Sequence, residues 1–130
     1  MRLDENNYVD QAERVILKLK DLKDFRGKDI PVVTTSKLRN LLAMTADIYN
    51  EVIVLKEDKL PEDIKGRINY LKIRFLYEAG REKGVKNLVK EAEILNHLDD
   101  IKGSRKQYLL FSRYMEALVA YRKFHVEKDD

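Results

Sequence analysis

The chain lacks cysteine and tryptophan, and it holds only two prolines and two histidines among its 130 residues. Without cysteine there is no disulfide scaffold, no thiolate zinc site and no cysteine nucleophile. Two histidines argue against a histidine-rich metal site, and we expect no metal and no cofactor. Two prolines and five glycines supply too few turn residues for a turn-rich all-β fold.

Long apolar runs are also missing. No stretch approaches the roughly 20 residues that span a bilayer, and the first residues, Met1–Glu5, have no apolar signal region. We therefore expect a cytoplasmic protein without a membrane partner. The length favours one domain, and the content of 44% hydrophobic and 38% charged residues argues against disorder.

The net charge of +3 is small, but the charges are clustered along the chain. Residues 65–90 carry eight basic and two acidic groups, which gives +6, and residues 102–123 carry six basic groups and one acidic group, which gives +5. Between these blocks, residues 91–101 carry four acidic groups and no basic one, which gives −4. Such clustering suits a polyanionic partner, although solvated helix faces would give the same pattern.

Apolar residues recur at steps of three and four almost throughout, which predicts a single all-α bundle of about five helices. We expect the first helix over residues 8–25, with Gly27 as its stop, and a third helix that starts at Pro61 and ends at Gly84. Residues 34–124 form the core bundle. Residues 1–26 hold a first helix that could be mobile or exchanged between subunits of a dimer.

No catalytic constellation is present. The chain has neither a phosphate-cradling glycine loop nor the Arg–His spacing of helical ribonucleases, because Arg122 precedes His125 by only three positions. The adjacent acidic pairs Asp99–Asp100 and Asp129–Asp130 point their side chains apart on a helix. We interpret His97 and His125 as structural or solvent-exposed, and we expect no enzyme.

Basic residues gather at helix starts and on one helix face. Lys37 and Arg39 follow three hydroxyls at a predicted helix N-terminus, where a bound anion would use the free N–H groups. The same pattern recurs at the starts of the fourth and last predicted helices. Arg67, Arg74 and Arg81 lie seven apart and form a stripe that suits a phosphate backbone. We expect the flanking Tyr70 and Tyr77 to pack in the core.

Three segments carry a further signal: Thr35–Leu41 (TSKLRNL), Tyr70–Glu82 (YLKIRFLYEAGRE) and Tyr114–Tyr121 (YMEALVAY). Together they resemble the small subunit of the type III-A CRISPR effector, the Csm complex. The resemblance covers residues 35–125 and leaves residues 1–33 outside it. It implies an all-α protein without its own nuclease. It also implies that copies stack head to tail beside the backbone and large subunits and contact guide RNA and paired target RNA.

The resemblance also implies which side chains meet RNA. The matching positions that would contact phosphate are Lys37, Arg39, Lys72, Arg74 and Arg81. Charge geometry alone adds Arg67, Lys86, Arg105, Lys106 and Arg113. Without a base-reading motif, we expect these contacts to be independent of sequence. Glu78 and Glu116 would orient arginines or make intersubunit contacts.

Two hypotheses therefore stand side by side. The first is an RNA-contacting, non-catalytic subunit of an RNA-guided complex. The second is a helical protein-interaction module that assembles by stacking its basic blocks on the acidic segment of the next copy, without direct RNA contact.

Overall fold

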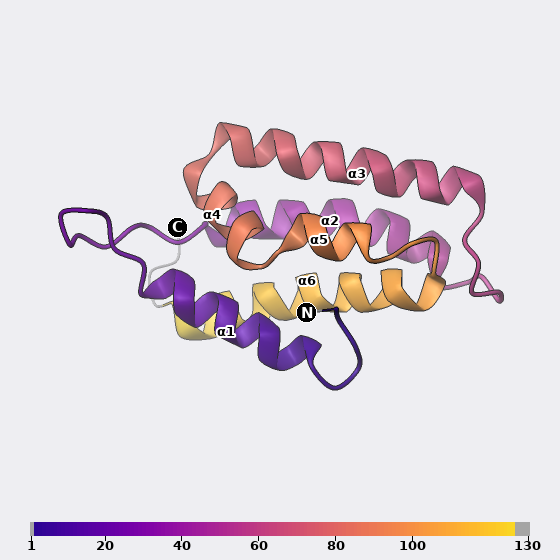
Figure 1. Cartoon of the computed structure of the whole chain (residues 1–130), viewed down its shortest axis with the longest axis horizontal. Coiled ribbons are helices and arrows are strands. Elements are labelled where there is room, and N and C mark those ends of the chain that lie inside the picture. The colour runs from indigo at the N-terminus through magenta and orange to yellow at the C-terminus, as the bar shows by residue number, and fades with distance from the viewer. Residues whose placement is uncertain (1, 127–130) are drawn as a thin grey trace.

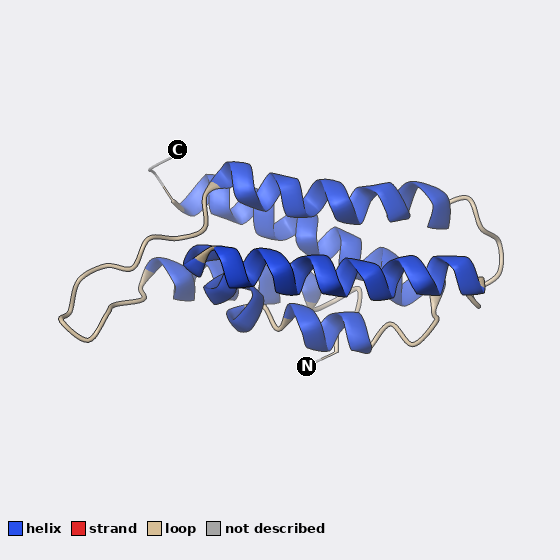
Figure 2. Cartoon of the chain, turned by 90° about the horizontal axis from the view of Figure 1, so that it is seen from above, coloured by secondary structure: helices blue, strands red, loops and turns tan. Residues whose placement is uncertain are grey.

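The computed structural model describes residues 2–126, which form six helices (Figures 1 and 2). They are α1 (Tyr8–Lys20), α2 (Thr35–Val52), α3 (Glu62–Arg81), α4 (Lys83–Glu91), α5 (Ile94–Asp99) and α6 (Arg105–His125). The described residues include no β-strand beyond isolated backbone bridges. The predicted all-α fold is confirmed, with six helices in place of about five.

Helix α6 is the centre of the bundle. It packs against both α1 and α2, and these are the most extensive contacts between helices (Figure 1). Its buried side chains lie on all sides of the helix, as its wide apolar arc predicts: Gln107, Tyr108, Leu109, Leu110, Phe111, Ser112, Tyr114, Met115, Leu118 and Arg122. A helix that is apolar nearly all round is stable only when it is enclosed.

Helix α3 lies at the outer edge of the bundle and runs beside α2 (Figures 1 and 2). It packs against α2, α4 and α5, and the edge-to-face contact of Phe75 with Phe111 connects it to α6. Its buried residues Ile64, Ile68, Leu71 and Phe75 form a single stripe. The opposite side of α3 therefore stays open to solvent.

The segment after α3 differs from its prediction. Helix α3 ends at Arg81, and Gly84 lies inside α4 instead of ending α3. A Cβ at Gly84 would lie 3.2 Å from the Val33 backbone, so this glycine permits close packing of α4 on the preceding connection. The predicted fourth helix is broken into α4 and α5 because Glu93 adopts a left-handed conformation at φ 52°.

The first helix is shorter than predicted. Helix α1 ends at Lys20 instead of near Phe25, because the next residues close into a small hairpin of their own. The Ile30 N–H donates to the Leu22 carbonyl (3.0 Å) and the Asp24 N–H donates to the Lys28 carbonyl (2.8 Å). Helix α1 packs on α6 and α4 of the same chain, while its exchange between subunits stays a prediction.

Among residues 2–126, Arg122 is the most deeply buried charged residue, with 2% of its surface exposed. Its Nε donates to the Val33 carbonyl at 2.8 Å. Together with the Gly84 packing, this bond holds the connection between α1 and α2 against both α4 and α6. No helix within residues 2–126 is long and apolar enough to span a membrane.

Candidate nucleic-acid interface

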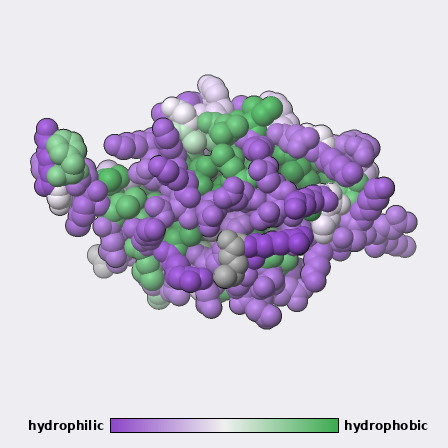
Figure 3. All heavy atoms as spheres, viewed as in Figure 1, coloured by the Kyte–Doolittle hydropathy of each residue, from purple (hydrophilic) through white to green (hydrophobic). Residues whose placement is uncertain are grey.

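The outer face of α3 carries aromatic and aliphatic side chains that the bundle does not cover. Tyr70 is 61% exposed and Tyr77 is 56% exposed, so the prediction that both tyrosines pack in the core is wrong. Ile73 and Leu76 are also exposed on this helix. Figure 3 shows an apolar area along the upper part of the molecule, where α3 lies.

The physical reason lies in the spacing of the buried stripe. Ile64, Ile68, Leu71 and Phe75 follow one another at steps of four and three, which completes the inward face of the helix. Tyr70 and Tyr77 are offset from that stripe by one or two residues, that is by 100–200° around a helix with 3.6 residues per turn. A helical-wheel argument restricted to the four buried positions would have placed them outside.

Two of the predicted arginines surround one tyrosine on this face. The guanidinium carbons of Arg74 and Arg81 lie 5.5 Å and 5.6 Å from the centre of the Tyr77 ring, within the range of cation–π attraction. Both guanidinium groups also pair with Glu78, at 3.4 Å each. Glu78 thus orients the two arginines, as predicted. The two guanidinium groups and the one carboxylate together carry a net charge of +1.

A hollow of about 310 Å³ separates α2 from α3 beside these residues. Arg67, Tyr70 and Arg74 line it from α3, and Met44, Asp47, Ile48 and Leu71 complete the lining. Arg67 pairs with Glu51 of α2. The stripe predicted from the spacing of seven therefore flanks an α2–α3 groove that combines arginines with an exposed aromatic ring. We call Arg67, Tyr70, Arg74, Tyr77 and Arg81 the α3 outer face.

Lys72 lies on the other flank of α3. Its Nζ pairs with the Asp99 carboxylate of α5 at 2.8 Å, whereas Arg67 pairs with α2. The two flanks of α3 are thus fixed to different neighbours, and Lys72 does not join the arginines.

The start of α2 is only partly available to an anion. Thr34 caps the helix by accepting from the Lys37 N–H at 3.1 Å. The Lys37 ammonium group pairs with Glu82 at the α3–α4 junction, 3.4 Å away. Arg39 is exposed, and no partner for it is present among residues 2–126. Of the two predicted cations, Arg39 is therefore the one directed to solvent without an ion pair.

The start of α6 already holds an anion from the same chain. Asp58 accepts from the Lys106 N–H at 2.8 Å and from the Ser104 hydroxyl at 3.0 Å. These hydrogen bonds, led by the one from the Lys106 backbone, lower the pKa of the Asp58 carboxyl. The expectation that this helix start receives an external anion is corrected, because Asp58 occupies the N–H groups.

Arg105 has a structural partner as well. Its guanidinium donates to the carbonyls of Val52 (3.2 Å) and Ile53 (2.9 Å). These carbonyls lie at the C-terminal end of α2, where cations are favourable. The side chains of Lys86, Lys106 and Arg113 are exposed, and none has an ion-pair partner in the described part of the chain.

Both histidines belong to the packing, as predicted. His97 is buried in an edge-to-face contact with Tyr114, 5.1 Å between ring centres. Burial lowers the pKa of His97, because neither ring nitrogen has a hydrogen-bond partner that would stabilise the charged form. His125 lies 2.8 Å from the Glu13 carboxylate of α1.

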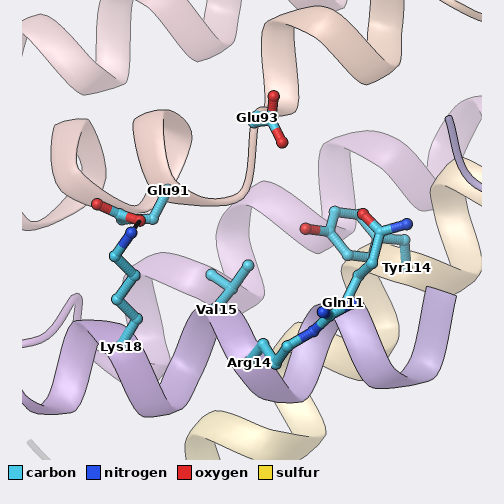
Figure 4. Close-up of a pocket in the computed structure, with 7 residues that line it drawn as sticks. All are labelled: Gln11, Arg14, Val15, Lys18, Glu91, Glu93 and Tyr114. Carbon is cyan, nitrogen blue, oxygen red and sulfur yellow. Dashed lines mark ion pairs between the residues drawn. The ribbon is translucent and has the colours of Figure 1, made fainter. Parts of the chain in front are cut away.

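A second hollow, of about 280 Å³, lies between α1 and α4 (Figure 4). Lys18 and Glu91 pair across it at 3.3 Å. The Tyr114 hydroxyl at its inner end donates to the Ala92 carbonyl, and burial raises the pKa of that phenol. No group of three or more acidic or histidine side chains within residues 2–126 is arranged to hold a metal ion.

Comparison with known proteins gives a consistent result. A family model described as Csm2 Type III-A matches residues 15–128. The chain belongs to the Csm2 family of type III-A CRISPR systems. The predicted resemblance is thereby confirmed. Its relatives include CRISPR system Cms protein Csm2 of Streptococcus thermophilus, which is 44% identical over 127 residues and covers 98% of both chains.

Other members of the Csm2 family are similarly close. The protein of Mycobacterium tuberculosis (strain CDC 1551 / Oshkosh) is 41% identical over 99% of both chains. That of Enterococcus italicus is 38% identical over 88% of this chain and 86% of its own. The match to the first two relatives extends over 98–99% of the chain. The first 33 residues therefore belong to the Csm2 similarity, which corrects the expectation that it begins at residue 35.

Proposed function

We propose that this chain is the non-catalytic small subunit of a type III-A CRISPR effector complex, where it binds the backbones of guide and target RNA. Several copies stack beside the backbone and large subunits of that complex. The family assignment supports the place in the complex. The RNA contact rests on the α3 outer face, which is the observation that carries the proposal.

The chemistry of that face suits single-stranded and paired RNA alike. Arg74 and Arg81 present guanidinium groups, which bind phosphate oxygens in pairs. Tyr77 between them offers a ring on which a splayed base can stack when a guanidinium group leaves the ring for phosphate, and stacking of this kind tolerates any base. A site that combines phosphate contacts with stacking binds RNA without reading its sequence.

The predicted RNA-binding residues divide by how free their side chains are. Arg39, Lys86, Lys106 and Arg113 are exposed without an ion pair in the described chain, so binding phosphate costs them no existing contact. Lys37, Arg67, Lys72, Arg74 and Arg81 each have a carboxylate partner. Phosphate has to compete with that partner. Arg105 contributes least, because its guanidinium is bonded to the end of α2.

The alternative of stacking by charge alone has less support. It requires the acidic segment 91–101 to be free for the basic block of a second copy. Three of its four acidic groups already have partners within the chain, because Lys18 pairs with Glu91, Lys72 pairs with Asp99 and the Asn96 amide donates to Glu93. Self-association by charge therefore has fewer groups to use than the sequence suggests.

The test is RNA binding by Arg74→Gln/Arg81→Gln, measured by fluorescence anisotropy across a salt series. Each phosphate contact contributes about 0.7 to the slope of log affinity against log salt for single strands, so losing two lowers the slope by about 1.4. The matched control is Lys20→Gln/Lys56→Gln, which removes two exposed cations elsewhere and changes the net charge equally.

We expect the control to keep the slope of the unaltered chain, apart from a small uniform loss of affinity. Equal losses in both variants would show that only net charge matters. That result, or no RNA binding at low salt in the assembled complex, would contradict the proposed role of the α3 outer face.

A further inference from the structure

The hollow of about 310 Å³ between α2 and α3 has an apolar floor that the chain itself leaves uncovered. Ile48 and Leu71 at this floor are buried in the bundle, and Met44 beside them is half-buried. The exposed Tyr70 adds an aromatic wall. The volume lies at the lower end of the roughly 300–1,000 Å³ typical of ligand pockets. The hollow therefore suits one flat ring system better than a large ligand.

One carboxylate lines this hollow without a partner of its own. Asp47 is exposed on α2, and its carboxylate makes no ion pair or hydrogen bond with residues 2–126. Arg67 and Arg74 line the same hollow, but they pair with Glu51 and Glu78 instead. A carboxylate beside groups that bind phosphate repels an RNA backbone unless the ligand supplies hydrogen-bond donors to it. Asp47 can accept such donors from a ligand in the hollow.

The two arginines that line the hollow lie on either side of its aromatic wall. Arg67 comes three residues before Tyr70 on α3, and Arg74 comes four residues after it, which are rises of about 4.5 Å and 6 Å along the helix. Phosphates bound at both arginines would bracket Tyr70, so the base between them would lie at the mouth of the hollow. Unpaired RNA bases stack on aromatic rings of this kind.

We propose that the α2–α3 hollow binds one unpaired base of the RNA and that Asp47 makes guanine the preferred base. Among the four RNA bases, guanine alone presents two adjacent donors on its Watson–Crick edge, the N1–H and the N2 amino group, and a carboxylate accepts from both at once. The same edges of uracil, cytosine and adenine set an acceptor beside the donor, which a carboxylate repels. The inference rests on the RNA contact that we propose above. Backbone contacts stay independent of sequence, and the hollow adds a preference at one position.

Methyl NMR of the full chain tests the hollow directly, because methionine is rare in it. The chain holds three methionines. Met44 lines the hollow, whereas Met115 is fully buried in α6. With carbon-13 labelling of the methionine methyl groups, guanosine monophosphate should shift the Met44 signal and leave the Met115 signal in place. Uridine monophosphate carries the same ribose and phosphate, so the ratio of the two affinities reports the base alone.

We expect guanosine monophosphate to bind about fivefold to a hundredfold more tightly than uridine monophosphate, which is the discrimination of one bidentate base contact. Inosine monophosphate, which lacks the N2 amino group, should fall between them. Asp47→Asn should bring the ratio close to one, because an amide presents a donor in place of one acceptor oxygen.

The matched control is Asp10→Asn, which changes the net charge equally. Asp10 is exposed on α1, and α1 packs on α6 and α4. Loss of one negative charge should raise the affinity for both nucleotides alike, so the control should keep the ratio of the unaltered chain. A preference for guanosine monophosphate that survives Asp47→Asn would overturn the role of Asp47.

Two further results would overturn the hollow as a guanine site. They are equal affinities of the unaltered chain for the two nucleotides, and a Met44 signal that does not move even at millimolar nucleotide. Either leaves the proposed function standing if Arg74→Gln/Arg81→Gln still lowers the salt slope of RNA binding. If that double variant keeps the slope while the Met44 shift persists, the RNA contact of the α3 outer face is wrong, and the assignment of the hollow to an RNA base falls with it.

Discussion

Helices α3 and α6 have similar lengths and both carry tyrosines, arginines and aliphatic residues, yet they use them in opposite ways. In α6 the polar groups of buried residues bond to the same chain: Tyr108 donates to the Thr45 carbonyl and Arg122 to the Val33 carbonyl. In α3 the tyrosines face solvent, and Tyr77 lies between two arginines. The polar chemistry of α6 holds the fold together, whereas that of α3 remains available to a partner.

Truncating an aromatic ring should give the largest difference in stability effect between the two helices. Phe111→Ala in α6 removes a fully buried ring, and we expect it to lower the free energy of unfolding by about 3–5 kcal/mol. Tyr77→Ala in α3 should change it by no more than about 0.5 kcal/mol. Urea denaturation followed by circular dichroism measures both. A cost above about 2 kcal/mol for Tyr77→Ala would show that α3 has no free outer face.

Removing a single tyrosine hydroxyl should also affect stability differently in α6 and in α3. Tyr108→Phe leaves the Thr45 carbonyl without the 2.7 Å hydrogen bond that it accepts inside the bundle, and we expect a loss of about 1–2 kcal/mol in the free energy of unfolding. Tyr70→Phe on α3 should have an effect near zero, because water replaces the partner of an exposed hydroxyl. Equal effects of the two substitutions would contradict the distinction.

A pH-dependent effect concerns His97, which packs against Tyr114 of α6. Burial against Tyr114 lowers the pKa of His97 in the folded chain, so the unfolded chain binds the extra proton first. Neutral His97 therefore leaves the folded chain at full stability above the ordinary histidine pKa of about 6.5. As the pH falls below that value, the free energy of unfolding decreases by at most about 1.4 kcal/mol per pH unit. His97→Phe should reduce the slope of the free energy of unfolding against pH between pH 7 and pH 5. An unchanged slope would mean that His97 does not titrate there.

Much of the fold is predictable from local spacing. The apolar steps locate all the long helices, and hydroxyl side chains, Thr34 and Ser104, cap α2 and α6. The errors lie where tertiary contacts override local signals. The sequence predicts that Gly84 ends a helix, but it lies inside α4, where the close approach of Val33 leaves little room for a side chain. The left-handed residue that separates α4 from α5 is Glu93, a residue type that gives no turn signal.

The candidate site was predictable in part. The seven-residue spacing of Arg67, Arg74 and Arg81 does describe one line on the outer side of α3, along which Arg81 is exposed and the other two are half-buried. Their partners could not be read from the chain, because Glu51 and Arg67 are brought together only when α2 and α3 pack side by side. The same holds for Asp58, which lies 46 residues before Ser104 in the sequence yet occupies the start of α6. Charge counts identify a basic block without showing which cations the fold has already used.

The most direct test of the central claim is ultraviolet cross-linking of the chain to guide–target RNA in the assembled complex, with the cross-linked peptides identified by mass spectrometry. If the α3 outer face meets RNA, cross-links will concentrate on the peptides that hold Tyr70 and Tyr77, and Tyr77→Leu will remove those at its position. Cross-links confined to α1 or to the exposed side of α6, with none on α3, would contradict the account.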